Sequence, residues 1–308
     1  MSSIQVRKVH SFNGHRDCVY TLAGSTMPSI FFSGGGDGMV VKWDLTTPNE
    51  GVLIATLPNS IYALHPIKDS DLIIAGHNYE GIHLLNWRQK KEAASLKVTS
   101  AAIFDIITFE GDILIATGDG ALVVVDLLNL QIKRKLFRSE KNTRVLAVNP
   151  ETGEVAVGYS DSYIRIFSLR DYQLKYEFQA HQNSVFALRY TPDHKFLISG
   201  SRDARLKAWD VTSGYKQSAE VVAHLFAINH IAFSPSGEYF ATASMDKSIK
   251  VWQTEELRLL KVIDKARHAG HGTSVNKLLW TSHQNQLISA SDDRTISVWE
   301  IGFPGPGT

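Results

Sequence analysis

The sequence predicts an all-β fold assembled from a repeated unit of about forty residues. Four histidines each stand 28 residues before a tryptophan, with an aspartate six residues before that tryptophan and a hydroxyl residue four before the aspartate. A four-residue set that recurs at fixed offsets indicates a repeat architecture, so function has to be sought in the array rather than in one motif. The sets are His15, Ser33, Asp37 and Trp43; His181, Ser199, Asp203 and Trp209; His224, Thr242, Asp246 and Trp252; and His271, Ser289, Asp293 and Trp299.

The spacing of the tryptophans and of the residues taken as their equivalents predicts seven units. Each unit contains short apolar runs rich in Val, Ile, Leu and aromatic residues, broken by Gly, Asp, Asn and Pro, which is typical of short strands joined by turns. No stretch keeps the 3.6-residue period of an amphipathic helix. The markers are Trp43, Asn86, Val125, Phe167, Trp209, Trp252 and Trp299, at steps of 43, 39, 42, 42, 43 and 47 residues.

Composition limits the possible classes of protein. A forty-residue repeat over 308 residues leaves no room for a separate module, and a net charge of +1 gives the whole molecule no long-range attraction to nucleic acid or membrane. The single cysteine, Cys18, excludes an intrachain disulfide and a cysteine-cluster metal site. Residues 1–14 carry no apolar signal segment, and the longest apolar run, residues 121–125, is too short to span a bilayer. We therefore expect a soluble, cytoplasmic protein.

These residues resemble the WD-repeat β-propeller family, and the resemblance covers essentially the whole chain. The family's Gly-His pair is found at Gly14-His15 and Gly270-His271, and its Trp-Asp pair at Trp43-Asp44 and Trp209-Asp210. Units one, five, six and seven match strongly, whereas units two to four lack the histidine and the tryptophan. The resemblance implies a seven-bladed β-propeller, with four-stranded antiparallel blades around a central channel.

The resemblance also implies how the ring closes. Only nine residues follow Trp299, too few for the outermost strand of the seventh blade, whereas Ile4–Phe12 has the pattern of a strand. We expect this N-terminal strand to complete the last blade. The expected single domain covers residues 1–303, and residues 304–308 are expected to form a flexible tail. The blades are expected at 13–58, 59–99, 100–139, 140–180, 181–222, 223–269, and 270–302 together with 3–12.

The repeated histidine, hydroxyl and aspartate suggest a hydrolase triad, but a structural role is favoured. Nucleophilic catalysis needs one exposed hydroxyl with a base and an oxyanion site, whereas this set recurs four times and no Gly-x-Ser-x-Gly turn is present. In the related family these residues form a buried hydrogen-bond chain within each blade. Burying any of these polar groups unpaired would cost about 1–3 kcal/mol. We therefore expect structural tetrads and no catalytic residue.

Two further motifs favour structural interpretations. The run Gly34–Gly38 suggests a phosphate cradle, but a strand follows it and no Lys-Ser or Lys-Thr stands at the required spacing, so a tight turn is expected. His268 and His271 have metal-ligand spacing, yet His271 already belongs to a tetrad and no carboxylate–cysteine cluster accompanies it. No metal and no cofactor are expected.

The resemblance further implies which residues project around the mouth of the channel on one face of the disc. They flank the first apolar residue of each innermost strand, or stand just before the turn aspartate. Aromatic and arginine side chains at a concave centre are typical of binding hot spots, although they could also simply plug the channel. The expected partner-binding residues are Tyr20, Tyr62, Phe104, Arg144, Leu146, Phe186, Arg202, Asn229, Met245, Asn276 and Asp292.

We therefore expect a non-enzymatic scaffold that binds a peptide segment of another protein on this face, as a monomer or as part of a larger complex, without a membrane partner. Two alternatives stay open. One is a small-molecule-binding or enzymatic propeller with its site at the channel mouth. The other is an RNA- or ribosome-associated assembly factor that uses the basic stretch 131–145, which carries a net charge of +5. A solvated outer strand protected by its charges is the simpler interpretation of that stretch.

Overall fold

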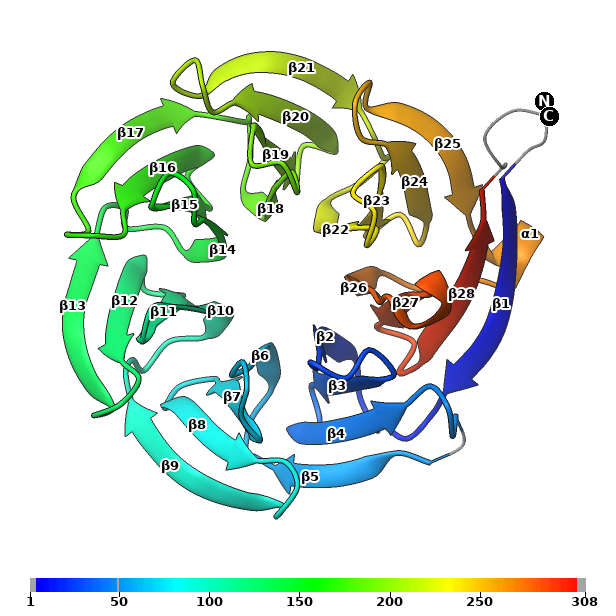
Figure 1. Cartoon of the computed structure of the whole chain (residues 1–308), viewed down its shortest axis with the longest axis horizontal. Helices are drawn as coiled ribbons and strands as arrows, with labels where there is room; N and C mark the ends of the chain where they lie inside the picture. Colours follow the sequence, from blue (N-terminus) through cyan, green and yellow to red (C-terminus); the bar gives the residue numbers. More distant parts are fainter. Residues whose placement is uncertain (1–3, 49, 304–308) are drawn as a thin grey trace.

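The computed structural model describes residues 4–48 and 50–303, which form a ring of seven four-stranded antiparallel sheets (Figure 1). The sheets stand radially around a central channel, and each begins with its innermost strand. This arrangement confirms the predicted all-β, seven-bladed propeller. The predicted tail, residues 304–308, lies outside the described residues. None of the helices among the described residues is long and apolar enough to cross a membrane.

The chain order from the inner to the outer strand is the same in the first six blades. Blade one contains β2 (Val19–Gly24), β3 (Ile30–Gly35), β4 (Met39–Asp44) and β5 (Val52–Thr56). Blade two contains β6 (Ile61–Pro66), β7 (Leu72–His77), β8 (Gly81–Asn86) and β9 (Lys91–Lys97). Blade three contains β10 (Ile103–Phe109), β11 (Asp112–Thr117), β12 (Ala121–Asp126) and β13 (Gln131–Phe137). Blade four contains β14 (Thr143–Asn149), β15 (Glu154–Tyr159), β16 (Tyr163–Ser168) and β17 (Leu174–Gln179).

Blades five and six continue this pattern, and blade seven departs from it. Blade five contains β18 (Val185–Tyr190), β19 (Phe196–Ser201), β20 (Arg205–Asp210) and β21 (Lys216–Val222). Blade six contains β22 (Ile228–Phe233), β23 (Tyr239–Ser244), β24 (Ile249–Gln253) and β25 (Arg258–Ile263). Blade seven contains β26 (Val275–Trp280), β27 (Leu287–Ser291) and β28 (Ile296–Gly302). Two short helices, α1 (Lys265–His268) and η1 (His283–Asn285), lie in its connections.

The outer strand of blade seven comes from the other end of the chain. Strand β1 (Gln5–Phe12) pairs with β28 in antiparallel register from Gln5 opposite Gly302 to Phe12 opposite Ile296. The blue and red ends of the ribbon therefore lie side by side in Figure 1. This pairing confirms the predicted closure of the ring by the N-terminal strand.

The core lies between neighbouring blades, because each sheet packs both of its faces. The second strands of the blades are accordingly almost wholly buried, as in β15, all of whose residues are buried. Outer strands are exposed and charged, as in β13, which limits pairing with another sheet edge. In blade two, Leu85 pairs with Ile73 as Trp43 pairs with Phe31. The tryptophan position of that blade is therefore Leu85, one residue before the marker Asn86 chosen from the sequence.

Each innermost strand carries a β-bulge at its second residue. In β2, for example, Val19 pairs with Gly35 and Thr21 with Gly34, so that Tyr20 is the extra, unpaired residue. The same shift occurs in the first strand of every blade. A bulge redirects its side chain out of the regular alternation of the strand. Seven side chains are thereby directed toward one end of the channel.

Deletion of residues 1–12 tests the closure of the ring. We expect cooperative unfolding to be lost, because the deletion removes β1 and the buried Phe12, whose ring lies 5.1 Å from that of Trp43. Differential scanning calorimetry measures this, and the expected loss of stability exceeds about 3 kcal/mol. Replacement of Arg7 by alanine is the control, since it removes only the exposed Arg7–Glu300 ion pair, worth less than about 1 kcal/mol. A deletion variant that melts like the intact protein would contradict this role of β1.

Candidate functional site on the top face

The four predicted tetrads are continuous hydrogen-bond chains. In blade one the Trp43 indole N–H lies 2.7 Å from the Ser33 hydroxyl, which lies 2.7 Å from His15 Nε2. His15 Nδ1 lies 3.0 Å from the Asp37 carboxylate. An indole only donates, so the serine hydroxyl accepts from it. A carboxylate only accepts, so His15 Nδ1 carries a proton and donates it to Asp37.

The other three tetrads have the same geometry. Their histidine Nδ1 lies 3.0, 2.8 and 2.9 Å from the aspartate in blades five, six and seven. The aspartates also accept backbone N–H groups on both sides, as Asp203 does from Gln182 and from Arg205. Each carboxylate thus fastens the loop before the innermost strand to the tight turn between the second and third strands. We call the end of the disc that carries these turns the top face.

Blades two to four fasten the same turns with other residues. In blade two the buried His77 accepts the backbone N–H of Asn59 at Nε2, 2.9 Å away. In blade three the Thr99 hydroxyl donates to Asp119, and in blade four Arg165 makes an ion pair with Asp161 at 2.9 Å. Asp119 and Asp161 stand at the turn position in the sequence, as the tetrad aspartates do. Their partners follow no repeated spacing, so the sequence alone could not identify them.

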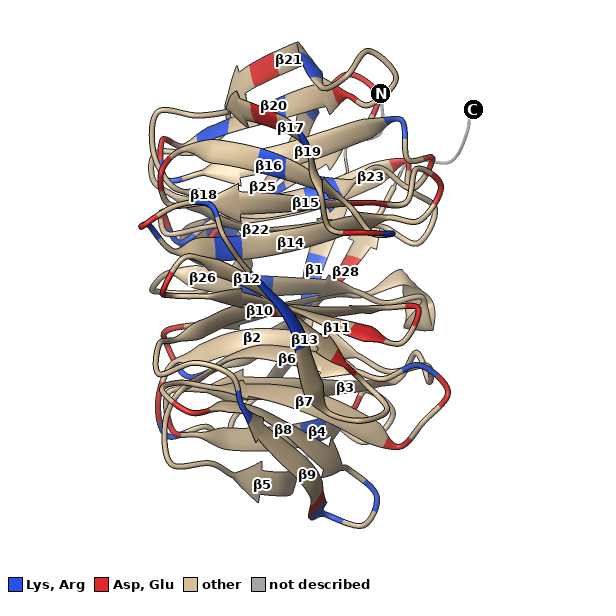
Figure 2. Ribbon diagram, turned by 90° about the vertical axis from the view of Figure 1, so that its left-hand side faces the viewer, with Lys and Arg blue, Asp and Glu red and all other residues tan. Residues whose placement is uncertain are grey.

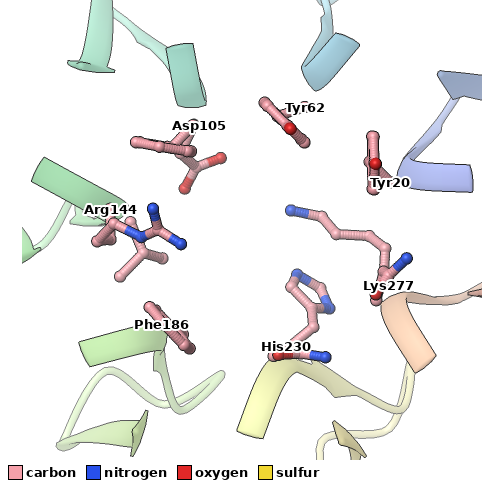
Figure 3. A pocket seen from close by; sticks show the side chains of 11 residues that line it. Tyr20, Tyr62, Asp105, Arg144, Phe186, His230 and Lys277 are labelled. Carbon is pink, nitrogen blue, oxygen red and sulfur yellow. The ribbon is translucent and has the colours of Figure 1, made fainter. Parts of the chain in front are cut away.

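The seven bulged residues stand around the mouth of the channel on the top face. Four of them are the aromatic residues Tyr20, Tyr62, Phe104 and Phe186, which we call the aromatic arc (Figure 3). The bulged residue between Phe104 and Phe186 is Arg144. The remaining two positions, in blades six and seven, hold asparagines, so the mouth has an aromatic side and an amide side.

The aromatic arc and Arg144 form one continuous stack across five blades. The ring centroids of Tyr20 and Tyr62 are 4.6 Å apart, and those of Tyr62 and Phe104 are 5.8 Å apart. The Arg144 guanidinium carbon lies 3.9 Å from the Phe104 centroid and 4.7 Å from that of Phe186, within the range of cation–π contacts. Burial lowers the pKa of Arg144 to about 10, so the guanidinium remains charged at neutral pH.

On the amide side the predicted residues make contacts between blades. The Asn229 side chain donates to the Val275 carbonyl oxygen at 2.8 Å. Asn276 donates to the Val19 carbonyl oxygen at 3.0 Å and to Asp292 at 2.7 Å. These amides therefore join blade six to blade seven and blade seven to blade one. Their donors are largely used within the protein.

One predicted mouth residue is placed wrongly. Leu146 is 1% exposed and packs in the core with Val157 and Phe167, so it cannot face a partner. The prediction took Val145 as the first apolar residue of the innermost strand and selected the residues on either side of it. In the structure the first residue of that strand, equivalent to Val19 and Ile61 in their blades, is Thr143. A hydroxyl residue at an otherwise apolar position shifted the assignment by two residues.

Three predicted residues stand before the turns, farther from the centre. Arg202, Met245 and Asp292 each donate their backbone N–H to the residue just before the innermost strand, which places them at equivalent positions in blades five, six and seven. Met245 is 58% exposed. Two exposed apolar residues that sequence reasoning did not select, Leu225 and Phe226, lie in the neighbouring loop before β22. Consecutive apolar residues in a predicted loop were the available signal for them.

Comparison with known proteins agrees with this geometry. The family model for the WD domain, G-beta repeat, matches residues 6–44, 172–210, 215–253 and 264–300. The chain belongs to the WD-repeat family. The first three of these repeats each run from the outer strand of one blade to the third strand of the next. This offset between repeat and blade is what leaves β1 to complete blade seven.

Individual WD-repeat relatives are distant and much longer than this chain. Human striatin is 22% identical over 240 residues, which cover 69% of this chain and 30% of striatin. The 66 kDa stress protein of Physarum polycephalum is 25% identical over 306 residues, covering 96% of this chain and 41% of that protein. Protein lethal(2)denticleless of Drosophila melanogaster is 24% identical over 320 residues, covering 96% and 34%. The chain thus spans well under half the length of these relatives.

Below the mouth the wall of this WD-repeat channel carries charged side chains that the sequence analysis did not select. Asp105, His230 and Lys277 line both the upper cavity at the mouth and the cavity beneath it, and Arg189 lines the lower one. Figure 3 shows Arg144 and Lys277 extending toward the middle from opposite sides. A charged residue within an otherwise apolar innermost strand was the signal that could have identified them.

Other candidate groups do not form reactive or metal-binding centres. Burial raises the pKa of the Cys18 thiol to about 11, with the Asp292 carboxylate adding to the shift, so the nucleophilic thiolate is not populated. His77, Glu80 and His83 bring potential ligand atoms within 4.8 Å of one another. However, His77 Nε2 accepts a backbone N–H, which puts the proton of the neutral ring on Nδ1, the nitrogen that faces Glu80. That tautomer has no lone pair for a metal.

The glycine run is a tight turn at the end of β3, and its backbone is close to other atoms. A Cβ at Gly35 would lie 2.5 Å from the Cys18 carbonyl oxygen, and one at Gly38, where φ is +70°, would lie 2.0 Å from that of Leu57. Glycine is needed here because the backbone of the next strand approaches too closely for a side chain. The run therefore serves the packing of blade one.

The tetrads should give this protein a characteristic acid sensitivity. Burial alone would raise the pKa of Asp246, but hydrogen bonds from His224, Ser248 and Leu225 outweigh it and hold the pKa below its usual value. Stability from such a group is present above the unfolded pKa of about 3.9 and is lost as pH falls toward the folded value. We expect Asp246→Asn to destabilise the protein by about 1–3 kcal/mol at pH 7 and to flatten its stability profile between pH 5 and 3.

Urea unfolding across that pH range measures both effects. Glu255→Gln is the matched control, since it removes one carboxylate from an exposed position. Asp203→Asn in blade five should behave like Asp246→Asn, because its carboxylate has the same partners. Unchanged midpoints at pH 7 in both tetrad variants would show that the hydrogen-bond chains add nothing to stability.

Proposed function

We propose that this protein is a non-enzymatic scaffold that binds a peptide segment of another protein on its top face. Relatives in the WD-repeat family typically act as scaffolds for protein interactions. The observation that carries the proposal is the continuous stack of the aromatic arc with Arg144 at the concave mouth of the channel. Aromatic rings and arginine on a rigid concave surface supply binding energy without ordering many side chains.

The apolar rim of blade six extends this surface outward. Leu225 and Phe226 are 84% and 59% exposed, and Met245 stands beside them on the adjacent turn. The position is fixed, since the Leu225 backbone N–H donates to Asp246 and the Phe226 carbonyl oxygen accepts from Ser244. Exposed apolar side chains held rigidly on one face favour a protein partner.

The charges on the top face favour an acidic partner segment. Arg202 is exposed at the pre-turn position of blade five and lies close enough to Arg144 for the two charges to interact. Arg144 is held by the two aromatic rings beside it, so its guanidinium is pre-organised for a carboxylate or phosphate. We infer that the aromatic arc anchors an apolar side chain while the two arginines select a neighbouring acidic group.

Enzymatic activity at the mouth is the weaker proposal. The four tetrad histidines are buried, and both ring nitrogens of each are engaged with the hydroxyl and aspartate partners. The Asp292 carboxylate at the mouth accepts the Asn276 amide, and the Cys18 thiol is held protonated. The described mouth residues therefore include no pair of a nucleophile and an accessible base.

RNA binding through the basic stretch is also weaker, because the fold divides that stretch. Arg144 lies at the channel mouth, whereas Lys133 and Lys135 lie on β13 at the circumference (Figure 1). Lys133 makes an ion pair with Asp112 at 2.6 Å, and Lys135 donates to the Val98 carbonyl oxygen. In Figure 2 the positive charge on β13 forms a narrow stripe with acidic residues nearby. Such a surface favours solvation over phosphate binding.

A double substitution at the mouth tests the proposal. Phe186→Ala with Arg202→Ala should reduce recovery of specific partners at least tenfold in an affinity pulldown, because hot-spot truncations typically cost 2 kcal/mol or more, which corresponds to roughly thirtyfold in affinity. Neither side chain belongs to a tetrad, so the melting temperature should change little. If the variant recovers the same partners at wild-type levels, the top face is not the binding surface.

A matched pair of leucines tests the rim of blade six independently. Leu225→Ser alters an 84% exposed leucine on the top face, and Leu128→Ser alters a 90% exposed leucine in the turn after β12, on the opposite face. We expect only the first to weaken partner recovery, by about three- to tenfold, because it removes apolar area from the proposed interface. If both variants recover less partner to the same extent, the loss comes from the more polar surface and not from a specific interface on the top face.

A further inference from the structure

The wall of the channel is built from two positions of each innermost strand. These are the third and fifth residues, one step and three steps past the bulge, and all but Thr21, Ala63, Ala187 and Ala232 line the upper or the lower cavity of the channel. Most of these positions hold small or apolar residues, as expected where seven strands converge. The residues are Thr21, Ala63, Asp105, Val145, Ala187, His230 and Lys277 at the third position, and Ala23, His65, Ile107, Ala147, Arg189, Ala232 and Leu279 at the fifth.

Two cations in this wall form no ion pair with a described carboxylate. The Lys277 ammonium also makes no hydrogen bond with any described residue, although Lys277 is partly buried. The Arg189 guanidinium lies 3.0 Å from His230 Nε2 and donates to the Leu188 carbonyl oxygen at 3.2 Å. Burial lowers the pKa of both groups, and the attraction of the Asp105 carboxylate opposes this shift in part. Repulsion by Arg189 lowers the pKa of Lys277 further.

The single carboxylate of the channel wall is already occupied. Asp105 accepts the backbone N–H of Leu146 at 2.9 Å and that of Ile106 at 3.1 Å. These bonds hold it against the wall, and among the described residues it forms no ion pair with either cation. Together with Arg144 at the mouth, three cations face one carboxylate, a net charge of +2. Uncompensated charges in a protein interior are costly, and such a cluster therefore calls for a counter-ion.

The charged groups converge where the upper and lower cavities meet. Asp105, His230 and Lys277 line both cavities, with Arg144 above and Arg189 below. The volumes are about 180 Å³ above and 470 Å³ below, many times the roughly 10–15 Å³ that one water molecule needs.

We propose that the channel binds a small dianionic oxyanion of the phosphate class at the level of Lys277, between Arg144 and Arg189. A dianion matches the net charge of +2, whereas a single carboxylate would leave one positive charge unbalanced. The two guanidinium groups offer paired N–H donors to two oxygens, and the ammonium supplies a point charge to a third. This site does not depend on peptide binding by the aromatic arc.

Isothermal titration calorimetry of the intact protein with inorganic phosphate, at pH 8 and low chloride, tests the site. We expect one phosphate per chain, and Lys277→Met should weaken binding at least about tenfold, because it removes a charged hydrogen-bond donor. Lys277→Arg should retain most of the affinity. Lys216→Met, on the exposed outer strand β21, is the control and should bind like the wild type. Absence of binding to the wild type, or equal binding by Lys277→Met, would overturn the proposal.

Thermal unfolding provides a second measurement that does not depend on the calorimetric signal. Phosphate should raise the melting temperature of the wild type and leave that of Lys277→Met unchanged. Without phosphate, Lys277→Met should be at least as stable as the wild type, since it removes an unpaired charge from the channel. A variant that is clearly less stable without phosphate would show that Lys277 already has a stabilising partner, and would overturn the inference.

A comparison of two probes identifies the source of the phosphate group. A short phosphoserine peptide that binds more tightly than inorganic phosphate, and loses this advantage with Phe186→Ala, indicates delivery by a partner through the mouth. Binding of inorganic phosphate without binding of the peptide indicates a free ion. In the second case the site stands even if the proposed peptide surface fails, so the two proposals are separable.

Discussion

The bulge at the second residue of each innermost strand is the constraint on which the functional surface depends. Seven strands converge on one axis, and a regular alternation would direct every other side chain into a space too narrow for it. The bulge shifts Tyr20 and its six equivalents up to the mouth and leaves the third and fifth residues to form the wall. The side chains at the mouth are therefore large, whereas most of those in the wall are small.

The tetrads serve this arrangement by fixing the turns on the same face. Each aspartate binds the loop that leads into its innermost strand, so the bulge lies a few residues from a rigid attachment. Blades two and three achieve the same end with His77 and Asp119, whereas Asp161 in blade four pairs with Arg165 on the third strand. The repeated motif is therefore one solution among several, and the constraint it meets is common to all seven blades.

The sequence predicted the fold well because its strongest signals are structural. The spacing from His15 to Trp43 recurs because the hydrogen-bond chain tolerates no insertion, and the closing strand followed from the shortage of residues after Trp299. Prediction failed where local chemistry was ambiguous. Because Thr143 stands where other blades have an apolar residue, the prediction wrongly added the buried Leu146 to Arg144 at the mouth of blade four. The grouping of Asp105, Arg189 and Lys277 along one channel could not be foreseen, because it depends on which blades stand opposite one another.

The asymmetry of the channel argues that its charges are functional rather than structural. A propeller closes equally well with alanine at the third position, as blades two and five show with Ala63 and Ala187. Replacing such a residue by lysine adds a burial cost and no hydrogen bond within the blade. Because the tetrads and the interblade core stabilise the ring, the protein can tolerate the free-energy cost of burying a lysine in the channel wall. Cations that the fold does not need, grouped beneath an aromatic mouth, are what a binding site for an anion requires.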